Sequence, residues 1–63
     1  MQLNIKKIKD EMRRQGMTQV QLAKRLRLTK QRVNYILKNG ARSFGVVQKI
    51  AKVFNLDPKD LII

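Results

Sequence analysis

Apolar residues recur along the chain at the three- and four-residue spacing of amphipathic helices, in four segments separated by short turn signals. No stretch alternates apolar and polar residues convincingly with the two-residue period of a strand. The positions expected to be buried are, in chain order, Ile5, Ile8, Met12, Leu22, Ala23, Leu26, Val33, Ile36, Leu37, Phe44, Val46, Val47, Ile50, Ala51 and Phe54. The pattern therefore predicts an all-α fold.

Capping residues set the expected ends of these helices. Each apolar segment is preceded by a residue with a short polar side chain: Asn4, Thr18, Thr29 and Ser43. Such a side chain can accept a hydrogen bond from the first helical turn. Gln21 completes a capping box with Thr18. The stop signals are Gly16, Asn39-Gly40 and Asn55. Asp57-Pro58 predicts a fifth, short helix through Leu61. Residues 1–63 are thus expected to form a single domain, a compact five-helix bundle.

Charge narrows the class of partner. The chain holds 15 Lys and Arg but only 4 Asp and Glu, a formal net charge of +11. The acids are Asp10, Glu11, Asp57 and Asp60, so residues 12–56 contain no carboxylate. A solvated surface that serves solubility alone is better built from charges of mixed sign. A large single-sign field usually steers an oppositely charged ligand, and a nucleic acid or an anionic membrane is therefore expected.

Several functional classes are disfavoured. The chain has no cysteine and no histidine, which removes disulfides, thiolate chemistry and the commonest zinc ligands. Its serine is expected to be a cap and its acids are scattered, so no enzyme, cofactor, metal or small-molecule substrate is expected. No signal-peptide core is recognisable, and no stretch approaches the roughly 18 apolar residues of a membrane span. We expect a soluble cytoplasmic protein.

The informative spacing lies between the second and third predicted helices. Only Arg27 and Leu28 separate Leu26 from Thr29, the short turn typical of a helix-turn-helix pair. On the third helix, residues 29–38, a rotation of about 100° per residue separates a polar face from the apolar stripe. The side chains directly opposite the stripe are Gln31, Tyr35 and Lys38. Arg32 and Asn34 flank them. These groups can match the donors and acceptors of base edges in the major groove.

The first turns of the second and third helices lack the Asp or Glu that helix N-termini usually carry. They open instead with Thr18-Gln19 and Thr29-Lys30, and a lysine there opposes the helix dipole. Phosphate groups of DNA would supply the missing negative charge. We expect Gln19 and Lys30 to contact DNA, and Thr18 and Thr29 to act mainly as caps.

Two segments resemble the Cro and phage-repressor type of helix-turn-helix domain, often called the xenobiotic-response-element family: GMTQVQLAKRLRLTKQRVNYI at residues 16–36 and VVQKIAKVFNLDPKDL at residues 46–61. The resemblance covers nearly the whole chain. It implies a lambda-repressor-like DNA-binding fold and a phage or prokaryotic regulator. It also implies a phosphate contact for Gln19 and base contacts for Lys30, Gln31 and Tyr35, whereas Arg32 and Asn34 occupy positions that the family uses more variably.

The chain departs from the family pattern in two places. Arg27 stands where the family usually has glycine, so a left-handed backbone is expected there, at a cost of roughly 1 kcal/mol. Met12 and Leu37 stand where members often pair Arg with Glu. We expect an apolar contact between these two residues in place of the ion pair, an exchange that is often neutral or stabilising.

The favoured function is a sequence-specific transcriptional regulator, a Cro-like repressor with an activator as the alternative. It is expected to bind double-stranded DNA as a homodimer on a palindromic operator with half-sites about 34 Å apart. The expected base readers are Lys30, Gln31, Arg32, Asn34 and Tyr35. The expected phosphate contacts are Thr18, Gln19, Lys24, Thr29, Lys38 and Arg42. An alternative for Arg42 is insertion into an adjacent minor groove. Leu61 is expected in the core, with Ile62 and Ile63 as candidates for a dimer contact.

Three alternatives stay open. RNA binding is disfavoured because Tyr35 is the one aromatic residue expected to be exposed as a stacking surface. A membrane-surface peptide is disfavoured by the capped segments and by Gln and Asn on the polar faces. A partner-binding module such as an antitoxin would use the same fold.

Overall fold

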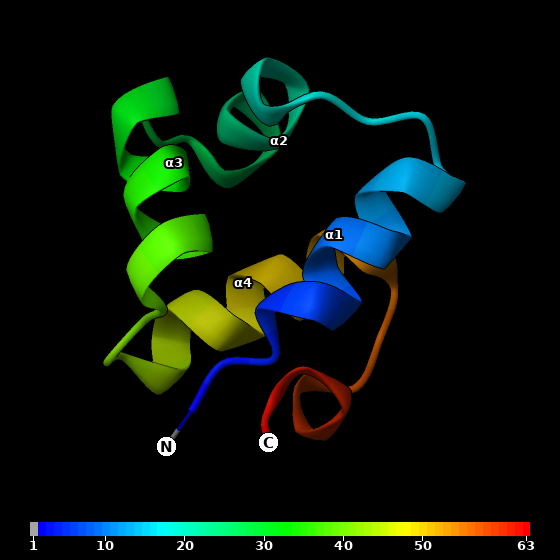
Figure 1. The fold of residues 1–63 in the computed structure, drawn as a ribbon, viewed down its shortest axis with the longest axis vertical. Coiled ribbons are helices and arrows are strands. Elements are labelled where there is room, and N and C mark those ends of the chain that lie inside the picture. The colour runs from blue at the N-terminus through cyan, green and yellow to red at the C-terminus, as the bar shows by residue number, and fades with distance from the viewer. Residues whose placement is uncertain (1) are drawn as a thin grey trace.

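The computed structural model describes residues 2–63, which form four α-helices and one 3-10 helix. These are α1 (Ile5–Arg14), α2 (Gln19–Leu26), α3 (Lys30–Asn39), α4 (Phe44–Phe54) and η1 (Pro58–Leu61). Figure 1 shows α1 and α3 on opposite sides of the molecule, α2 above and α4 between them. α2 packs on both α3 and α4, and η1 packs on α4 and α1.

The predicted caps define most helix starts. Asn4, Thr18 and Thr29 each accept a hydrogen bond from the backbone N–H three residues later, at 3.1, 3.2 and 3.1 Å. The capping box is confirmed, because the Gln21 side chain accepts in return from the Thr18 N–H at 2.9 Å. Ser43 lies at the N-cap of α4, but its side chain makes no capping hydrogen bond. The third helix begins and ends one residue later than predicted, with Thr29 as its cap.

A residue with positive φ follows each of α1 to α4, as the stop signals predicted. Gly16 and Gly40 have φ angles of 63° and 85°, and Asn55 has 57°. Arg27 ends α2 with φ 59° and ψ 40°, which confirms the left-handed backbone expected at this non-glycine position. Its N–H donates to the carbonyl oxygen of Lys24 at 3.2 Å. The turn between α2 and α3 therefore keeps the shape that glycine would adopt without strain.

The prediction of five helices is wrong in one respect, because the last segment is a 3-10 helix. The predicted start is confirmed, with Asp57 accepting from the Lys59 N–H at 2.9 Å and Pro58 in the first turn. The Asp60 N–H then donates to the carbonyl oxygen of Asp57, three residues back, at 2.8 Å. A run this short closes with the tighter three-residue hydrogen bonds instead of an α-helical turn.

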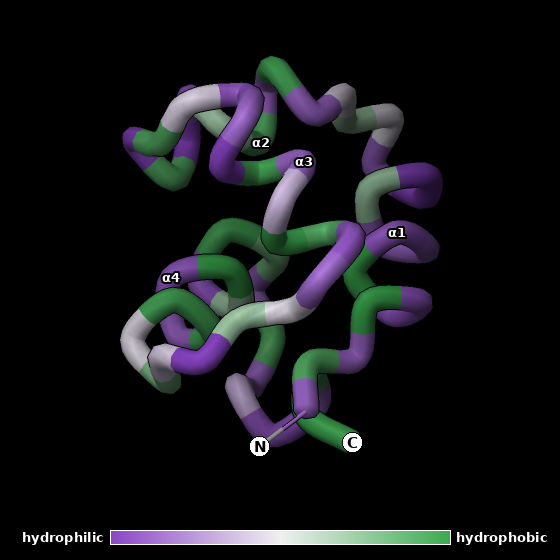
Figure 2. Tube along the Cα trace, turned by 60° about the vertical axis from the view of Figure 1, so that its left-hand side comes forward, coloured by the Kyte–Doolittle hydropathy of each residue, from purple (hydrophilic) through white to green (hydrophobic). Residues whose placement is uncertain are grey.

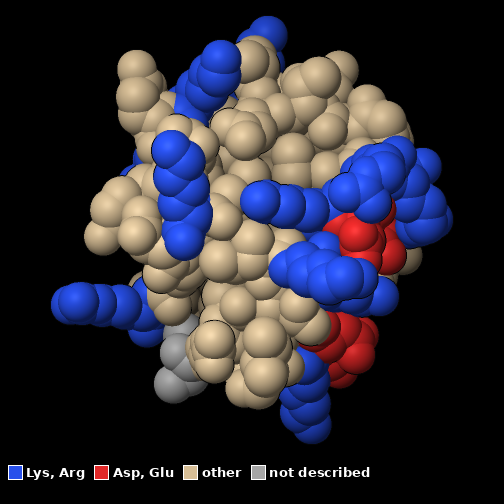
Figure 3. Space-filling model, viewed as in Figure 1, with Lys and Arg blue, Asp and Glu red and all other residues tan. Residues whose placement is uncertain are grey.

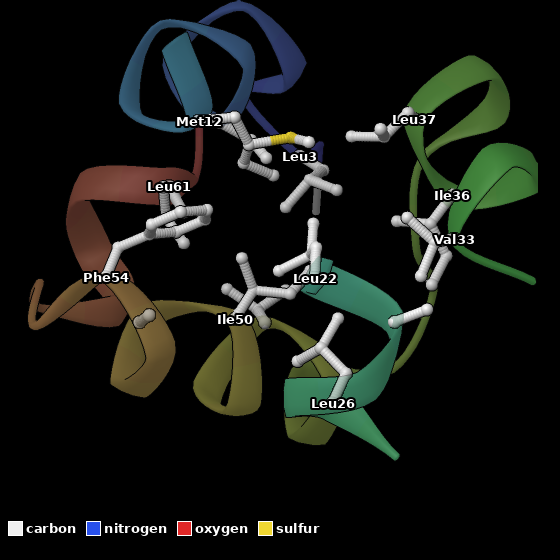
Figure 4. Close-up of a cluster of buried hydrophobic side chains, with 14 residues drawn as sticks. Leu3, Met12, Leu22, Leu26, Val33, Ile36, Leu37, Ile50, Phe54 and Leu61 are labelled. Carbon is white, nitrogen blue, oxygen red and sulfur yellow. The ribbon is translucent and has the colours of Figure 1, made fainter. Parts of the chain in front are cut away.

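One apolar cluster fills the space between the helices (Figure 4). It consists of Leu3, Ile8, Met12, Leu22, Ala23, Leu26, Val33, Ile36, Leu37, Val47, Ile50, Ala51, Phe54 and Leu61. Figure 2 shows the same separation on α1, whose apolar positions face the other helices and whose polar positions face outward. Leu61 is fully buried, so its expected place in the core is confirmed.

Three expected core positions differ in the structure. Ile5 and Val46 are half-buried, and Phe44 is 45% exposed. Phe44 is the first residue of α4, one turn before the buried Val47, and it lies outside the core cluster. The sequence predicts Tyr35 as the one exposed aromatic side chain, and the structure shows that Phe44 is exposed as well.

The two residues expected to replace an ion pair by an apolar contact are both buried. Met12 and Leu37 are 8% and 5% exposed and belong to the same core cluster. In Figure 4 the thioether of Met12 is directed toward Leu37. α1 is thereby attached to the α3 side of the core by dispersion and burial, without the desolvation cost of a charge pair.

The segments at the two ends of the described chain meet in an antiparallel bridge between Leu3 and Ile62. The Asn4 N–H donates to the carbonyl oxygen of Leu61 at 2.7 Å, and the Ile63 N–H donates to that of Gln2 at 2.9 Å. Both Figure 1 and Figure 2 show these ends side by side. The bridge brings Leu3 into the core, which helical periodicity did not predict.

Every helix within residues 2–63 falls short of the length and apolar character that crossing a bilayer requires.

Candidate nucleic-acid interface

The buried residues of α3 determine which of its side chains face outward. Val33, Ile36 and Leu37 are at most 5% exposed, and they fix the rotation of the helix about its axis. Gln31, Tyr35 and Lys38 lie on the opposite side and are exposed, with Tyr35 58% accessible. The orientation expected from helical periodicity is therefore confirmed.

The flanking candidates on α3 are placed less uniformly. Lys30 and Arg32 are exposed, whereas Asn34 is half-buried. Within residues 2–63, none of the side chains of Lys30, Gln31, Arg32, Asn34 or Tyr35 takes part in a side-chain hydrogen bond. Their donors and acceptors are therefore free for a ligand, with Asn34 the least accessible of the set.

The starts of α2 and α3 present backbone N–H groups with no acidic residue in the first turn. Thr18 and Thr29 are exposed, and each hydroxyl oxygen accepts the capping hydrogen bond while its O–H can still donate to another acceptor. Gln19, the first residue of α2, is half-buried, and Lys30, the first residue of α3, is exposed. This arrangement suits an anion at either helix start.

A hollow of about 580 Å³ runs beside α3 and joins it to the loop before α4. It brings Arg42 of the loop together with Arg32 and Tyr35 of α3. Ser43 and Asn39 also line this hollow, and neither was a sequence candidate. The sequence pattern marks Ser43 as an N-cap, so it predicts a hydroxyl engaged in capping. It gives no sign that this hydroxyl makes no capping hydrogen bond.

The remaining candidates lie in separate places. Lys24 lines a hollow of about 300 Å³ with residues 15–17, Gln21 and Arg25, and therefore does not share a hollow with the α3 residues. Lys38 lines another, of about 320 Å³, which it shares with Arg42. The structure thus gathers Arg32, Tyr35, Lys38 and Arg42 along α3 and the following loop, and leaves Lys24 apart from them.

The acidic side chains of α1 are occupied by their own helix. In the described part of the chain all four ion pairs lie within α1, the shortest joining Arg14 to Glu11 at 2.6 Å and another joining Lys6 to Asp10 at 3.2 Å. The hydrogen bond from Arg14 lowers the pKa of the Glu11 carboxyl, and that from Lys6 lowers the pKa of Asp10. Glu11 is only 8% exposed, a burial that the sequence did not indicate.

No acidic residue occurs in α2, α3 or the turns on either side of them. Figure 3 shows the acidic side chains on the α1 side of the molecule and only basic and uncharged side chains on the α3 side. Across residues 2–63, no group of three or more acidic, histidine or cysteine side chains comes together that could hold a metal ion. The chemistry that α3 offers is hydrogen bonding and attraction of a polyanion.

Comparison with known proteins gives one match. A family model described as helix-turn-helix matches residues 8–61, which covers most of the chain. No curated protein and no solved structure matches significantly. The matched region contains α2, the Arg27 turn and α3, in the geometry described above. The chain therefore belongs to the Cro and repressor type of helix-turn-helix DNA-binding domains, and it is a DNA-binding transcription regulator.

Proposed function

We propose that this protein is a sequence-specific repressor that inserts α3 into the major groove of its operator. The observation that carries the proposal is the exposed polar face of α3, with Gln31, Tyr35 and Lys38 directly opposite the buried stripe. A groove about 12 Å wide admits a helix with this face turned to the bases. Repression then needs only that the bound domain exclude another protein from the same duplex.

The roles of individual side chains follow from their positions on this face. Gln31 and Tyr35 point outward from the first half and middle of α3 and read base edges, together with Lys30, Arg32 and Asn34. The phosphate contacts come from the two helix starts and from the basic side chains around them: Thr18, Gln19, Lys24, Thr29, Lys38 and Arg42. Phosphate contacts set the register of the helix, and base contacts set the sequence preference.

The protein binds as a homodimer in this proposal. Ile63 is 73% exposed and follows the half-buried Ile62 at the bridge to Leu3, which leaves an apolar surface suited to self-association. A two-fold dimer of helix-turn-helix domains binds half-sites about 34 Å apart. The operator should accordingly be palindromic, and residues 1–63 should fold as one domain in each subunit.

Selection of bound sites from random duplex DNA at physiological salt tests this function. The expected result is a two-fold consensus with half-site centres about 10 base pairs apart. Recovery of all sequences alike would contradict sequence-specific reading, and a single unpaired half-site would contradict the dimer. Selection from single-stranded RNA provides the comparison, because two exposed aromatic side chains, Tyr35 and Phe44, are available for stacking.

Two variants separate base reading from phosphate binding. Gln31→Ala should relax the preference at one or two base pairs, at a cost of about 1–3 kcal/mol on the consensus duplex. Lys38→Gln should weaken binding to every duplex, and the slope of log affinity against log salt concentration should become shallower by about 0.9 for each phosphate that is no longer neutralised. The matched control is Lys9→Gln on the exposed side of α1, which should leave both quantities unchanged. Equal losses for Gln31→Ala on consensus and random DNA would remove Gln31 from base reading.

A further inference from the structure

A further basic hollow lies between the end of α2 and the later part of α4; it shares no residue with the hollow beside α3 and only Arg25 with the hollow that Lys24 lines. We call it the α2–α4 groove, and it has a volume of about 490 Å³. Its residues are Arg25, Leu26 and Arg27 from α2 and the following turn, and Lys49, Lys52 and Val53 from α4. None of them lines the hollow beside α3, and none is among the DNA contacts assigned above. DNA binding by α3 therefore leaves the groove without a function.

The groove is cationic without any compensation. Its four charged side chains, Arg25, Arg27, Lys49 and Lys52, are exposed, and none forms an ion pair within residues 2–63. Residues 12–56 contain no carboxylate at all. Like charges around a shared hollow repel one another, and a bound anion would relieve that repulsion.

Arg27 adds an independent observation. Its backbone has φ 59° and ψ 40°, a conformation that is strained for any residue with a Cβ and free of strain for glycine. The side chain makes no ion pair with the described residues that would compensate. A strained residue that persists where glycine would fit points to a use for its side chain, and here that side chain lines the groove.

The lining combines cations with an apolar surface. Leu26 is buried and Val53 is half-buried, and both contribute to the groove between the charged side chains of α2 and α4. Arginine forks pair with carboxylates through two parallel hydrogen bonds, and lysines add point charges. An apolar side chain flanked by carboxylates matches this pattern.

We propose that the α2–α4 groove binds an acidic segment of a partner protein in which an apolar side chain lies between aspartate or glutamate residues. All four cations are exposed, so the groove is open to solvent. Small-molecule sites typically enclose about 70–90% of their ligand. An open groove suits an extended chain that continues beyond it, and Arg-rich recognition of acidic motifs is a known mode of peptide binding.

The test uses a short labelled peptide with a central leucine between aspartates and glutamates, and a second peptide with glycine in place of the leucine. Binding to the full chain is measured by fluorescence anisotropy and by backbone amide chemical shifts. The leucine peptide should bind more tightly and should shift the amides of Arg25, Arg27, Lys49 and Lys52 more than those of α3. Equal binding of the two peptides, or shifts centred on α3, would overturn the proposal.

Matched variants separate the groove from general attraction to a basic protein. Lys49→Gln/Lys52→Gln should weaken peptide binding at least about fivefold. Lys9→Gln/Lys59→Gln removes the same charge from exposed positions outside the groove and should leave the affinity unchanged within about twofold. Arg27→Gly removes one groove cation and the strained Cβ together, so its lower affinity should come without loss of folding. Equal losses in the two lysine pairs would contradict a defined site.

Two competitors identify the occupant. A duplex of random sequence should bind without displacing the peptide or shifting the amides of Lys49 and Lys52, because the proposed DNA contacts lie elsewhere. Inorganic phosphate at the peptide's concentration should produce no comparable shifts in the groove. Displacement by the duplex would make the groove part of the DNA footprint, and equal shifts with phosphate would make it a site for a small anion. Either result overturns the assignment of a protein partner.

Discussion

Replacement of Arg27 by glycine should make the domain more stable. Arg27 holds the left-handed conformation with φ 59°, where the Cβ of an L-residue approaches the following carbonyl oxygen at a cost of about 1–2 kcal/mol. Glycine removes that cost and loses about 0.4–1 kcal/mol, because its unfolded chain is more flexible. The exposed side chain forms no ion pair with the described residues, so little else is lost. The two ranges leave a net gain of about 0–1.6 kcal/mol, with a central value of about 0.8 kcal/mol.

Thermal and urea unfolding monitored by circular dichroism measure this gain. A domain of this size should melt about 2–8 °C higher in Arg27→Gly than in the parent chain. Arg27→Ala is the matched control, because it removes the same charge and keeps the Cβ. Asn55→Gly, at the other non-glycine left-handed position (φ 57°), should gain less, since asparagine visits this conformation more readily. If Arg27→Gly melts no higher than Arg27→Ala, the turn is not strained and the reasoning fails.

Three further predictions concern the core, a cap and the response to acid. Leu61→Ala should lower the free energy of unfolding by about 2–5 kcal/mol, because Leu61 is fully buried; a loss under about 1 kcal/mol in urea titration would show that η1 is dispensable. Thr18→Ala should cost about 1 kcal/mol through loss of the capping box, and Thr18→Ser should restore most of it, as measured by thermal unfolding. The pKa of Glu11 is lowered in the folded state, chiefly by the hydrogen bond from Arg14, so its contribution is full above the ordinary value of 4.5 and is lost as the pH falls below it. The melting temperature should therefore decline less steeply below about pH 4.5 in Glu11→Gln than in the parent chain, and parallel declines would contradict this assignment.

The two basic surfaces give the domain separate uses for its charge. The α3 face and the loop carrying Arg42 form the proposed DNA contact, and the α2–α4 groove is proposed for an acidic partner. Arg27 lies in the turn that sets α3 against α2 while its side chain lines the groove. A protein held in the groove would therefore sit against the segment that orients the recognition helix.

The sequence by itself determined the helices and their outward faces. The Thr18–Gln21 capping box, the stop at Asn55 and the left-handed turn at Arg27 all depend on hydrogen bonds and steric contacts within a few residues. The exposure of Gln31 and Tyr35 followed from helical periodicity for the same reason. Such features depend on local chain geometry, and the residues that produce them are neighbours in the sequence.

The tertiary structure alone decided the features that join distant segments. Phe44 matches the apolar pattern of α4 and is nevertheless exposed, because burial depends on which element covers a position. The bridge from Leu3 to Ile62 brings together segments from opposite ends of the described chain. The α2–α4 groove likewise exists only once Arg25 and Arg27 are packed opposite Lys49 and Lys52. Burial and charge proximity are set by packing between elements, and helical periodicity does not specify which elements pack together.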